Sequence, residues 1–259
     1  MADTASRKTP QRSVRKTLLD GNVAFQVTEA YKNLRTNLTF ALSTKNSKVF
    51  AVSSAMAGEG KSTLAANTAI AMAEAENKVL VIDCDLRKPV QHKMFKLNNT
   101  RGLSTLLGGI HSFKEVVNEG VAENLDVITC GPIPPNPSEL LSSDKMKVLL
   151  EELSKYYDYI VLDTPPINIV TDALTLIDSI AGFLLTVKHR VSTYDTLGVA
   201  IESIKMANGS ILGVVINSVE VSSGKYGGKY NYRYKYRYKY NYNYNYNYTY
   251  GGPDDTDDD

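Results

Sequence analysis

Short apolar runs alternate with longer amphipathic stretches through most of the chain. Six runs rich in Val, Ile and Leu are expected to form strands buried on both faces. They cover residues 48–54, 78–83, 125–130, 159–163, 182–188 and 211–217. Four longer stretches, 62–76, 138–157, 171–180 and 193–207, are expected as helices that cross over between parallel strands. The pattern predicts an α/β fold in which helices flank a mostly parallel central sheet.

A further helix is expected over residues 25–42, ahead of the first strand. Its apolar positions recur at three- and four-residue steps, and this stripe should pack on the domain. The stripe consists of Ala30, Tyr31, Leu34, Leu38 and Leu42. Glu29, Lys32 and Arg35 are expected on the opposite side, where they face either solvent or another subunit.

The distribution of charge divides the chain of 259 residues into three parts, although its formal net charge is only +1. We expect a flexible basic segment over residues 1–22, one domain over 23–222, and a tail over 223–259 that ends in acidic residues. The sequence has no apolar run of membrane-spanning length, and its first 22 residues have no signal-peptide core, which favours a cytosolic chain. Cys84 and Cys130 have no pattern of a disulfide framework or a zinc site, so buried thiols are expected.

A glycine-rich loop follows the first strand and opens a helix, which is the setting that a P-loop requires. Gly58 and Gly60 would let backbone N–H groups approach phosphate, and Lys61 would reach the β- and γ-phosphates. Ala55 stands where the usual motif has its first glycine. The candidate nucleotide-binding residues of this loop are Ala57, Gly58, Glu59, Gly60, Lys61, Ser62 and Thr63.

Acidic side chains follow two later strands. Asp83 and Asp85 come at the end of one strand, and Asp163 ends another. Because parallel strands present their carboxyl ends on one edge of the sheet, all three carboxylates can converge on the P-loop. Hard oxygen donors suit Mg²⁺, so Ser62, Asp83 and Asp163 are the candidate metal ligands.

The tail contains twelve of the seventeen tyrosines in the chain, eleven of them at alternate positions. They are Tyr226, Tyr230, Tyr232, Tyr234, Tyr236, Tyr238, Tyr240, Tyr242, Tyr244, Tyr246, Tyr248 and Tyr250. Interleaved Asn, Lys and Arg favour disorder, although the alternation also fits an edge strand with every ring on one face. A phosphate-binding loop together with clustered hydroxyl acceptors suggests an enzyme that phosphorylates its own tail. Full phosphorylation would add a charge of about −18 to −24.

These motifs resemble those of the bacterial tyrosine kinases (BY-kinases) of capsule and exopolysaccharide assembly. The resemblance runs from about residue 29 to residue 217 and includes the tail. It rests on the P-loop of residues 54–63, on Asp83, Asp85 and Arg87 as a DxDxR motif, on a DxxP motif at residues 163–166, and on the loop of residues 131–141. An ExxRxxR oligomerisation motif is matched as Glu29, Lys32 and Arg35, with Lys32 where the family has arginine.

The resemblance implies a P-loop NTPase fold related to MinD and ParA, ATP and Mg²⁺ as cofactors, and autophosphorylation in trans within a ring of subunits. Lys61 and Asp83 would act in catalysis with Asp85, the candidate base or hydroxyl-orienting group. Asn217 would contact adenine, and Glu29, Lys32 and Arg35 would form the subunit contact. A separate transmembrane adaptor that activates the kinase at the inner face of the membrane and a protein-tyrosine phosphatase are the implied partners.

Three other functions fit parts of the sequence. A ParA- or MinD-like partitioning ATPase would share the fold, but Met56 stands where those proteins carry a signature lysine. Basic residues among aromatic ones could stack on single-stranded nucleic acid, yet no basic groove accompanies them, so no nucleic-acid partner is expected. The alternating tyrosines could also form an assembly segment through strand pairing. Detection of phosphotyrosine after incubation with ATP would separate a kinase from all three.

Overall fold

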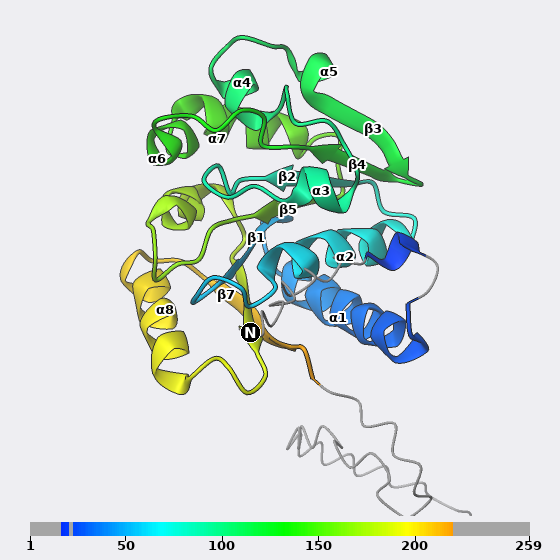
Figure 1. Cartoon of the computed structure of the whole chain (residues 1–259), viewed down its shortest axis with the longest axis vertical. Coiled ribbons are helices and arrows are strands. Elements are labelled where there is room, and N and C mark those ends of the chain that lie inside the picture. The colour runs from blue at the N-terminus through cyan, green and yellow to red at the C-terminus, as the bar shows by residue number, and fades with distance from the viewer. Residues whose placement is uncertain (1–16, 21–22, 220–259) are drawn as a thin grey trace, which may run out of the picture. The chain divides into compact units, whose positions relative to one another are not determined.

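One sheet carries the fold of residues 17–20 and 23–219, which are the residues described by this computed structural model (Figure 1). Its strands are β1 (Val49–Ser54), β2 (Val79–Asp83), β3 (Val117–Ala122), β4 (Leu125–Ile128), β5 (Tyr159–Asp163), β6 (Phe183–Lys188) and β7 (Ile211–Asn217). Their order across the sheet is β3-β4-β2-β5-β1-β6-β7, and every pairing except that of β3 with β4 is parallel. The predicted α/β fold with a mostly parallel sheet is therefore confirmed.

Helices cover both faces of the sheet. The α-helices are α1 (Phe25–Ser43), α2 (Lys61–Ala73), α3 (Gln91–Met94), α4 (Leu103–Leu107), α5 (Phe113–Val116), α6 (Pro137–Leu141), α7 (Asp144–Leu153) and α8 (Tyr194–Met206). Two 3-10 helices are η1 (Leu18–Asp20) and η2 (Asp172–Ser179). One core contains the apolar side chains of α1 and α2, which lie side by side, and the other contains those of α7, η2 and α8 (Figure 1).

Alternate residues of the central strands feed these two cores. Val49 and Ala51 of β1 belong to the core of α7 and α8, whereas Phe50 and Val52 belong to the core of α1 and α2. Successive side chains of a strand point to opposite faces of the sheet, so a strand covered on both faces needs apolar residues at every position. This requirement explains the unbroken apolar runs in the sequence.

The helix expected over residues 138–157 is divided in the structure. α6 ends at Leu141 and α7 begins at Asp144. The break has a local cause, because the hydroxyl of Ser143 accepts the N–H of Met146 and caps the start of α7. The helix expected over residues 171–180 is present as η2, and it is of the 3-10 type.

The two outer strands of the sheet, β3 and β7, differ from what the sequence predicted. β3 was not predicted because Asn118, Glu119 and Gly120 interrupt its apolar residues; it pairs antiparallel with β4. β7 was expected to be buried on both faces, which is wrong because it lies at the edge of the sheet. Its Val214 and Ile216 side chains are exposed. An edge strand needs only one packed face, and the apolar pattern alone did not separate it from a central strand.

α1 packs on α2 through part of its predicted stripe. Leu38 and Leu42 are buried, and Tyr31 and Leu34 are partly buried against the same core. Ala30 is exposed, so its assignment to the packed stripe is wrong. These contacts fix α1 along the face of the domain that also carries the P-loop helix.

The charged residues of α1 do not share one solvent-facing side. The ammonium of Lys32 lies 2.8 Å from a carboxylate oxygen of Glu29, and the two side chains are 46% and 40% exposed. Arg35 instead donates a hydrogen bond of 2.8 Å to the backbone carbonyl of Ala71 on α2. The expectation that Arg35 faces away from the domain is therefore wrong, because position 35 lies beside the packed stripe and its long side chain reaches the next helix.

Near the N-terminus, residues 17–20 pack against α2. Thr17 is buried, and the N–H of Leu18 donates a hydrogen bond of 2.8 Å to the side chain of Asn67. The remainder of the segment predicted as flexible, and the whole tail from residue 223, lie outside the described residues. Cys84 and Cys130 are buried free thiols, as expected. Nowhere in the described part of the chain does a helix have the length and apolar character needed to cross a membrane.

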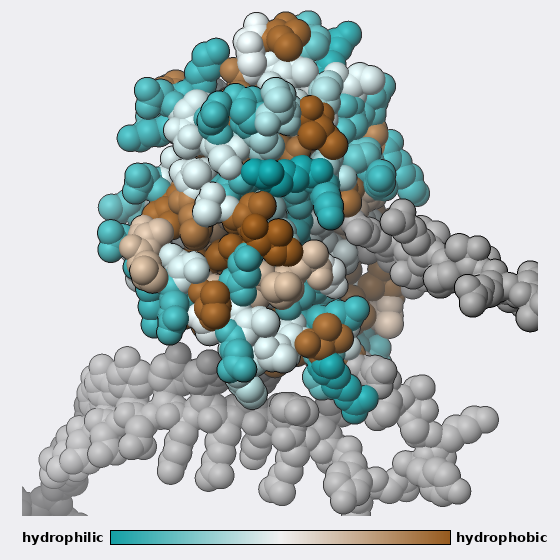
Figure 2. Space-filling model, turned by 60° about the vertical axis from the view of Figure 1, so that its left-hand side comes forward, coloured by the Kyte–Doolittle hydropathy of each residue, from teal (hydrophilic) through white to brown (hydrophobic). Residues whose placement is uncertain are grey.

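Apolar side chains also reach the surface along α8 and the loop before it. Val191, Val199 and Met206 are all more than half exposed. Figure 2 brings the α8 side forward and shows apolar side chains grouped among polar ones on this face. This side of the domain therefore leaves apolar area in contact with solvent.

Candidate active site

The P-loop connects β1 to α2 at the carboxyl edge of the sheet. Gly58 and Gly60 adopt φ values of 85° and 101°, in the left-handed region that favours glycine. A Cβ atom at Gly60 would overlap the side-chain amide of Asn217. Helix α2 begins at once, since the N–H of Leu64 donates to the carbonyl of Gly60 at 2.9 Å. The loop thus places the positive end of α2 beside the lysine that follows Gly60.

Side chains outside the motif hold this loop in shape. The buried carboxylate of Glu59 accepts the N–H of Met56 at 2.9 Å and the hydroxyl of Ser192. The amide of Asn217 donates to the carbonyl of Glu59 at 3.0 Å. Ser192 lies in the loop between β6 and α8, and no motif in the sequence marks its role. Asn217, predicted to contact adenine, lies beside the P-loop with its amide nitrogen bound to the loop backbone.

The acidic residues converge on Lys61. Its ammonium lies 2.7 Å from a carboxylate oxygen of Asp85, 3.4 Å from one of Asp163 and 3.1 Å from the hydroxyl of Ser62. The carboxylates are almost fully buried, at 4% and 0% side-chain exposure. Burial works to lower the pKa of Lys61, but the charges of Asp163 and Asp85 outweigh it and hold the pKa above its usual range. Lys61 is therefore a charged ammonium among carboxylates.

Asp83 is the most perturbed acid of the group. Burial, together with the negative charge of Asp163, raises the pKa of Asp83 to about 8. Three backbone N–H groups partly compensate, because Asp83 accepts from Asp85 at 3.2 Å, from Val90 at 3.1 Å and from Gln91 at 2.9 Å. Asp83 and Asp163 are paired in register on the neighbouring strands β2 and β5. The cluster thus contains more negative than positive charge.

Gln91 joins three parts of the site, although the sequence did not identify it. Its side-chain nitrogen donates to Asp163 at 2.8 Å and to the backbone carbonyl of Ser62 at 3.0 Å. Its backbone N–H is one of the donors to Asp83. Gln91 follows the DxDxR motif by four residues, and a glutamine at a helix start carries no pattern that would have distinguished it.

Arg87 faces a different partner. Its guanidinium makes two hydrogen bonds to the buried carboxylate of Asp172, at 2.7 and 3.0 Å, and Ser138 donates to the same carboxylate at 2.5 Å. Burial would raise the pKa of Asp172, but these hydrogen bonds and the positive charge of Arg87 hold the pKa below its usual range. The bridge ties the loop after β2 to α6 and η2, so Arg87 organises the rim of the site.

The donor set fits a hard cation and phosphate. A hydroxyl, Ser62, and the carboxylates of Asp83 and Asp163 are oxygen donors of the kind that Mg²⁺ prefers. No three acidic, His or Cys side chains of the described residues form a closed metal-binding group. Mg²⁺ usually binds one or two carboxylates and completes its coordination shell with water and phosphate, so it does not need a closed group of protein ligands.

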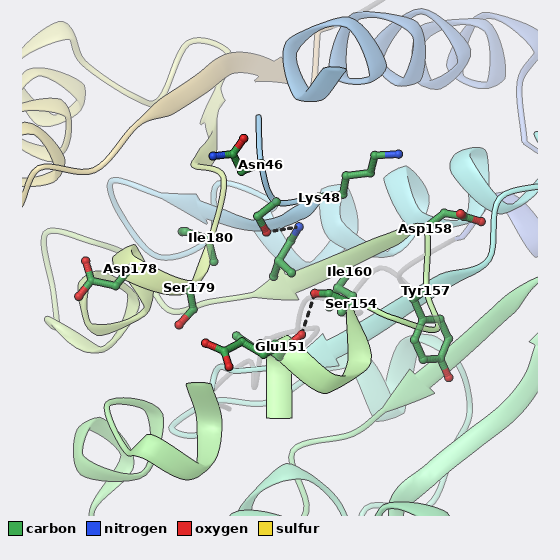
Figure 3. A pocket seen from close by; sticks show the side chains of 13 residues that line it. Asn46, Lys48, Glu151, Ser154, Tyr157, Asp158, Ile160, Asp178, Ser179 and Ile180 are labelled. Carbon is green, nitrogen blue, oxygen red and sulfur yellow. Dashed lines mark hydrogen bonds between the residues drawn. The ribbon is translucent and has the colours of Figure 1, made fainter. Parts of the chain in front are cut away.

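Two cavities lie at opposite ends of the parallel strands. One of about 400 Å³ adjoins the P-loop and is lined by residues that include Leu18, Tyr31, Thr63 and Asn217. The larger, of about 550 Å³, lies where β1 and β5 begin and has Lys48 among its lining residues (Figure 3). The cluster of Lys61 and the aspartates lies at the carboxyl ends of the strands. The smaller cavity therefore adjoins this cluster, and the larger cavity does not.

The candidate phosphoacceptors from Tyr226 to Tyr250 lie outside the described residues. Of the predicted catalytic and metal-binding residues, the structure brings Lys61, Ser62, Asp83, Asp85 and Asp163 together. Glu29 and Lys32 pair with each other on α1.

Comparison with known proteins agrees with the fold and the site described above. Residues 47–208 match the AAA domain family. Tyrosine-protein kinase YwqD from Bacillus subtilis (strain 168) is 41% identical over 205 residues, which cover 78% of this chain and 86% of YwqD. The solved kinase domain of Escherichia coli tyrosine kinase ETK is 30% identical with a TM-score of 0.73, over 83% of this chain and 95% of that chain.

A more distant structure shares the fold alone. The septum site-determining protein MinD from Pyrococcus horikoshii OT3 is 22% identical with a TM-score of 0.55, over 65% of this chain and 69% of that chain. The fold is thus the P-loop NTPase fold that the motifs predicted. With the kinase relatives covering most of its length, the chain belongs to the bacterial tyrosine kinase family and is a protein-tyrosine kinase.

Proposed function

We propose that this chain transfers the γ-phosphate of ATP, with Mg²⁺, to tyrosines of its own C-terminal tail, and that one subunit of a homo-oligomer modifies another. The observation that carries the proposal is the position of Lys61. Its ammonium lies at the start of α2 beside the Ser62 hydroxyl and two buried carboxylates. Phosphoryl transfer needs positioning and charge neutralisation, and this arrangement supplies both.

Each residue has a distinct role in this proposal. Lys61 exchanges the carboxylates of Asp85 and Asp163 for the β- and γ-phosphates. Ser62, Asp83 and Asp163 would hold Mg²⁺, which neutralises the charge that develops on the phosphate oxygens. The tyrosine oxygen forms a bond to the γ-phosphorus while the bond from that phosphorus to the β–γ bridging oxygen breaks and ADP leaves. Asp85 orients the hydroxyl and accepts its proton.

A mixing experiment tests transfer in trans. The donor is the full chain with all twelve tail tyrosines changed to Phe, and the acceptor is the Lys61→Met chain. The acceptor needs only its tail, so its own stability is not critical. Phosphotyrosine should appear on the acceptor in the mixture and on neither chain incubated alone with ATP. A mixture without phosphotyrosine on the acceptor, alongside a labelled wild type, would limit the enzyme to transfer within one chain.

A wild type that produces no phosphotyrosine from Mg²⁺-ATP would overturn the kinase proposal itself. In that case the fold shared with MinD would leave nucleotide hydrolysis as the activity to measure. Phosphotyrosine that maps to the tail would favour an acceptor role over nucleic-acid binding or passive assembly.

The subunit contact is assigned to the face of α1 that carries Glu29, Lys32 and Arg35. The exposed pair of Glu29 and Lys32 contributes little in water, so it can be exchanged for contacts across an interface. Phe25 and Phe40 of the same helix are 74% and 72% exposed, which offers apolar area for a second subunit. Arg35 would have to release the carbonyl on α2 to take part.

Light scattering of the Glu29→Ala/Arg35→Ala double variant tests this contact. The double variant should be monomeric at concentrations at which the wild type is oligomeric, and Thr39→Ala, an exposed change on the same helix, should behave as the wild type. Equal masses for the double variant and the wild type would remove these residues from the interface.

The family resemblance supports the wider role. We place the chain in the cytoplasm at the inner face of the membrane, where a separate transmembrane adaptor activates it and a protein-tyrosine phosphatase reverses the modification. The cycle would regulate capsule or exopolysaccharide synthesis and export. Phosphotyrosine that rises when the membrane fraction of the source cell is added, and not when the fraction is boiled first, would support an adaptor. Loss of the protein with no change in polysaccharide would contradict this role.

A further inference from the structure

Gln91 lies where the P-loop helix and the two acidic strand ends meet. It is fully buried, although glutamine is a residue type that is mostly exposed. Its side-chain nitrogen bridges Asp163 of β5 and the backbone of Ser62 in α2, and its own backbone N–H binds Asp83 of β2. One residue therefore contacts both carboxylates that the proposed function assigns to Mg²⁺ and the backbone of the serine that carries the third ligand.

The orientation of the Gln91 amide is fixed by its partners. A carboxylate oxygen and a backbone carbonyl can only accept hydrogen bonds, so both require the NH₂ group rather than the amide oxygen. The amide oxygen is then left buried and without a hydrogen-bond partner among the described residues. A buried polar atom without a partner costs free energy and needs an explanation.

The two carboxylate oxygens of Asp163 have different partners. One oxygen accepts the Gln91 amide at 2.8 Å, and the other faces the ammonium of Lys61 at 3.4 Å. The contact with Lys61 is the longer one and can be exchanged when phosphates attract the lysine. Gln91 thereby holds the carboxylate in one rotation and presents a single oxygen toward the site.

We infer that Gln91 is a positioning residue that orients Asp83 and Asp163 for a divalent cation and whose amide oxygen accepts a hydrogen bond from a water bound to that cation. The inference rests on the proposed Mg²⁺-nucleotide site. Groups that hold metal ligands in place typically contribute 10- to 100-fold in metal affinity. A glutamine suits this place because it donates to a carboxylate without adding a negative charge to an already acidic cluster.

Calorimetric titration of ADP over a range of Mg²⁺ concentrations tests the inference. The Gln91→Met variant keeps an unbranched side chain of similar size but loses both amide functions. It should need about 10- to 100-fold more Mg²⁺ to reach half of the metal-dependent gain in ADP affinity. Its ADP affinity in EDTA should fall by less than its ADP affinity in Mg²⁺. Gln91→Glu, which cannot donate when ionised, should be impaired at least as strongly.

Thr68→Val is the matched control. Thr68 is also buried, lies on α2, and has a hydroxyl without a hydrogen-bond partner in the described part of the chain. This variant should keep the wild-type Mg²⁺ midpoint. If Gln91→Met has the wild-type midpoint while wild-type binding depends on Mg²⁺, the Gln91 inference is wrong. If wild-type binding does not respond to Mg²⁺, the proposed metal site fails as well.

A second measurement uses the wild-type protein, so it does not depend on whether a variant folds. Gln91 is one of only three glutamines in the chain, so glutamine labelled with ¹⁵N at its side chain gives three amide pairs in an NMR spectrum. The Gln91 pair should exchange slowly with solvent, and it should shift when Mg²⁺ is added to the ADP-bound protein but not when NaCl of equal ionic strength is added. A slowly exchanging pair that ignores Mg²⁺ would overturn the inference.

Discussion

The buried acid Asp83 predicts a specific dependence of stability on pH. Its pKa is raised from 3.8 to about 8, so the folded protein retains a proton that the unfolded chain loses near pH 4. The stabilisation is complete below the unfolded pKa and is lost as the pH rises through the folded pKa. Between pH 7 and pH 9 the folded state releases most of one proton while the unfolded chain releases none at this position.

The size of the effect follows from that proton. At about 1.4 kcal/mol for each unit of pKa difference, a group with a folded pKa near 8 loses about 1.4 kcal/mol of unfolding free energy between pH 7 and pH 9. Asp83→Asn removes this titration. Its amide NH₂ would face a backbone N–H donor where the acid had an acceptor, a mismatch that costs about 1–3 kcal/mol and does not depend on pH, so it leaves the slope unaffected.

Urea unfolding at pH 6, 7, 8 and 9, without nucleotide or Mg²⁺, measures how the free energy of unfolding of each protein changes with pH. Other groups that titrate in this range, such as the cysteines, are shared by both proteins and cancel in the comparison of slopes. Asp158→Asn, a change at an exposed acid before β5, is the control and should keep the wild-type slope. Equal slopes for wild type and Asp83→Asn between pH 7 and pH 9 would show that Asp83 is already ionised at neutral pH, and would refute the reasoning.

Three further changes test the contacts around the site. Lys61→Met leaves the buried carboxylate of Asp85 unpaired and should cost about 3–5 kcal/mol in urea unfolding without nucleotide, so wild-type stability would contradict the buried ion pair. Ser192→Ala removes the hydroxyl bound by Glu59 and should lower ADP affinity about three- to tenfold by calorimetry as the P-loop loosens; unchanged affinity would make this contact irrelevant to binding. Arg87→Lys gives up one of two hydrogen bonds to the buried carboxylate of Asp172 and should lower the free energy of unfolding in urea by about 1 kcal/mol, whereas an equally stable variant would show that one bond suffices.

The sequence predicted what depends on local pattern and missed what depends on tertiary contact. Unbroken apolar runs identified the central strands because both faces are covered, and the glycines of the P-loop are required by backbone geometry that the sequence displays. The break before α7 could have been anticipated from a serine cap, but β3 could not, since a short edge strand of mixed apolar and polar residues has no periodic signal. Gln91 and Ser192 contribute through partners more than 70 residues away, and no spacing in the chain encodes such contacts.

The excess of negative charge around Lys61 has a consequence for how long the protein survives in a cell. A ligand that binds only the folded state adds about 2.7 kcal/mol of stability at a hundredfold excess over its dissociation constant. The Mg²⁺ that would accompany the nucleotide would relieve the repulsion among the carboxylates at this site, so Mg²⁺-nucleotide would stabilise the fold. A fall in the nucleotide pool would then expose more of the chain to proteases, and the amount of kinase would follow the energy supply of the cell through degradation rather than synthesis.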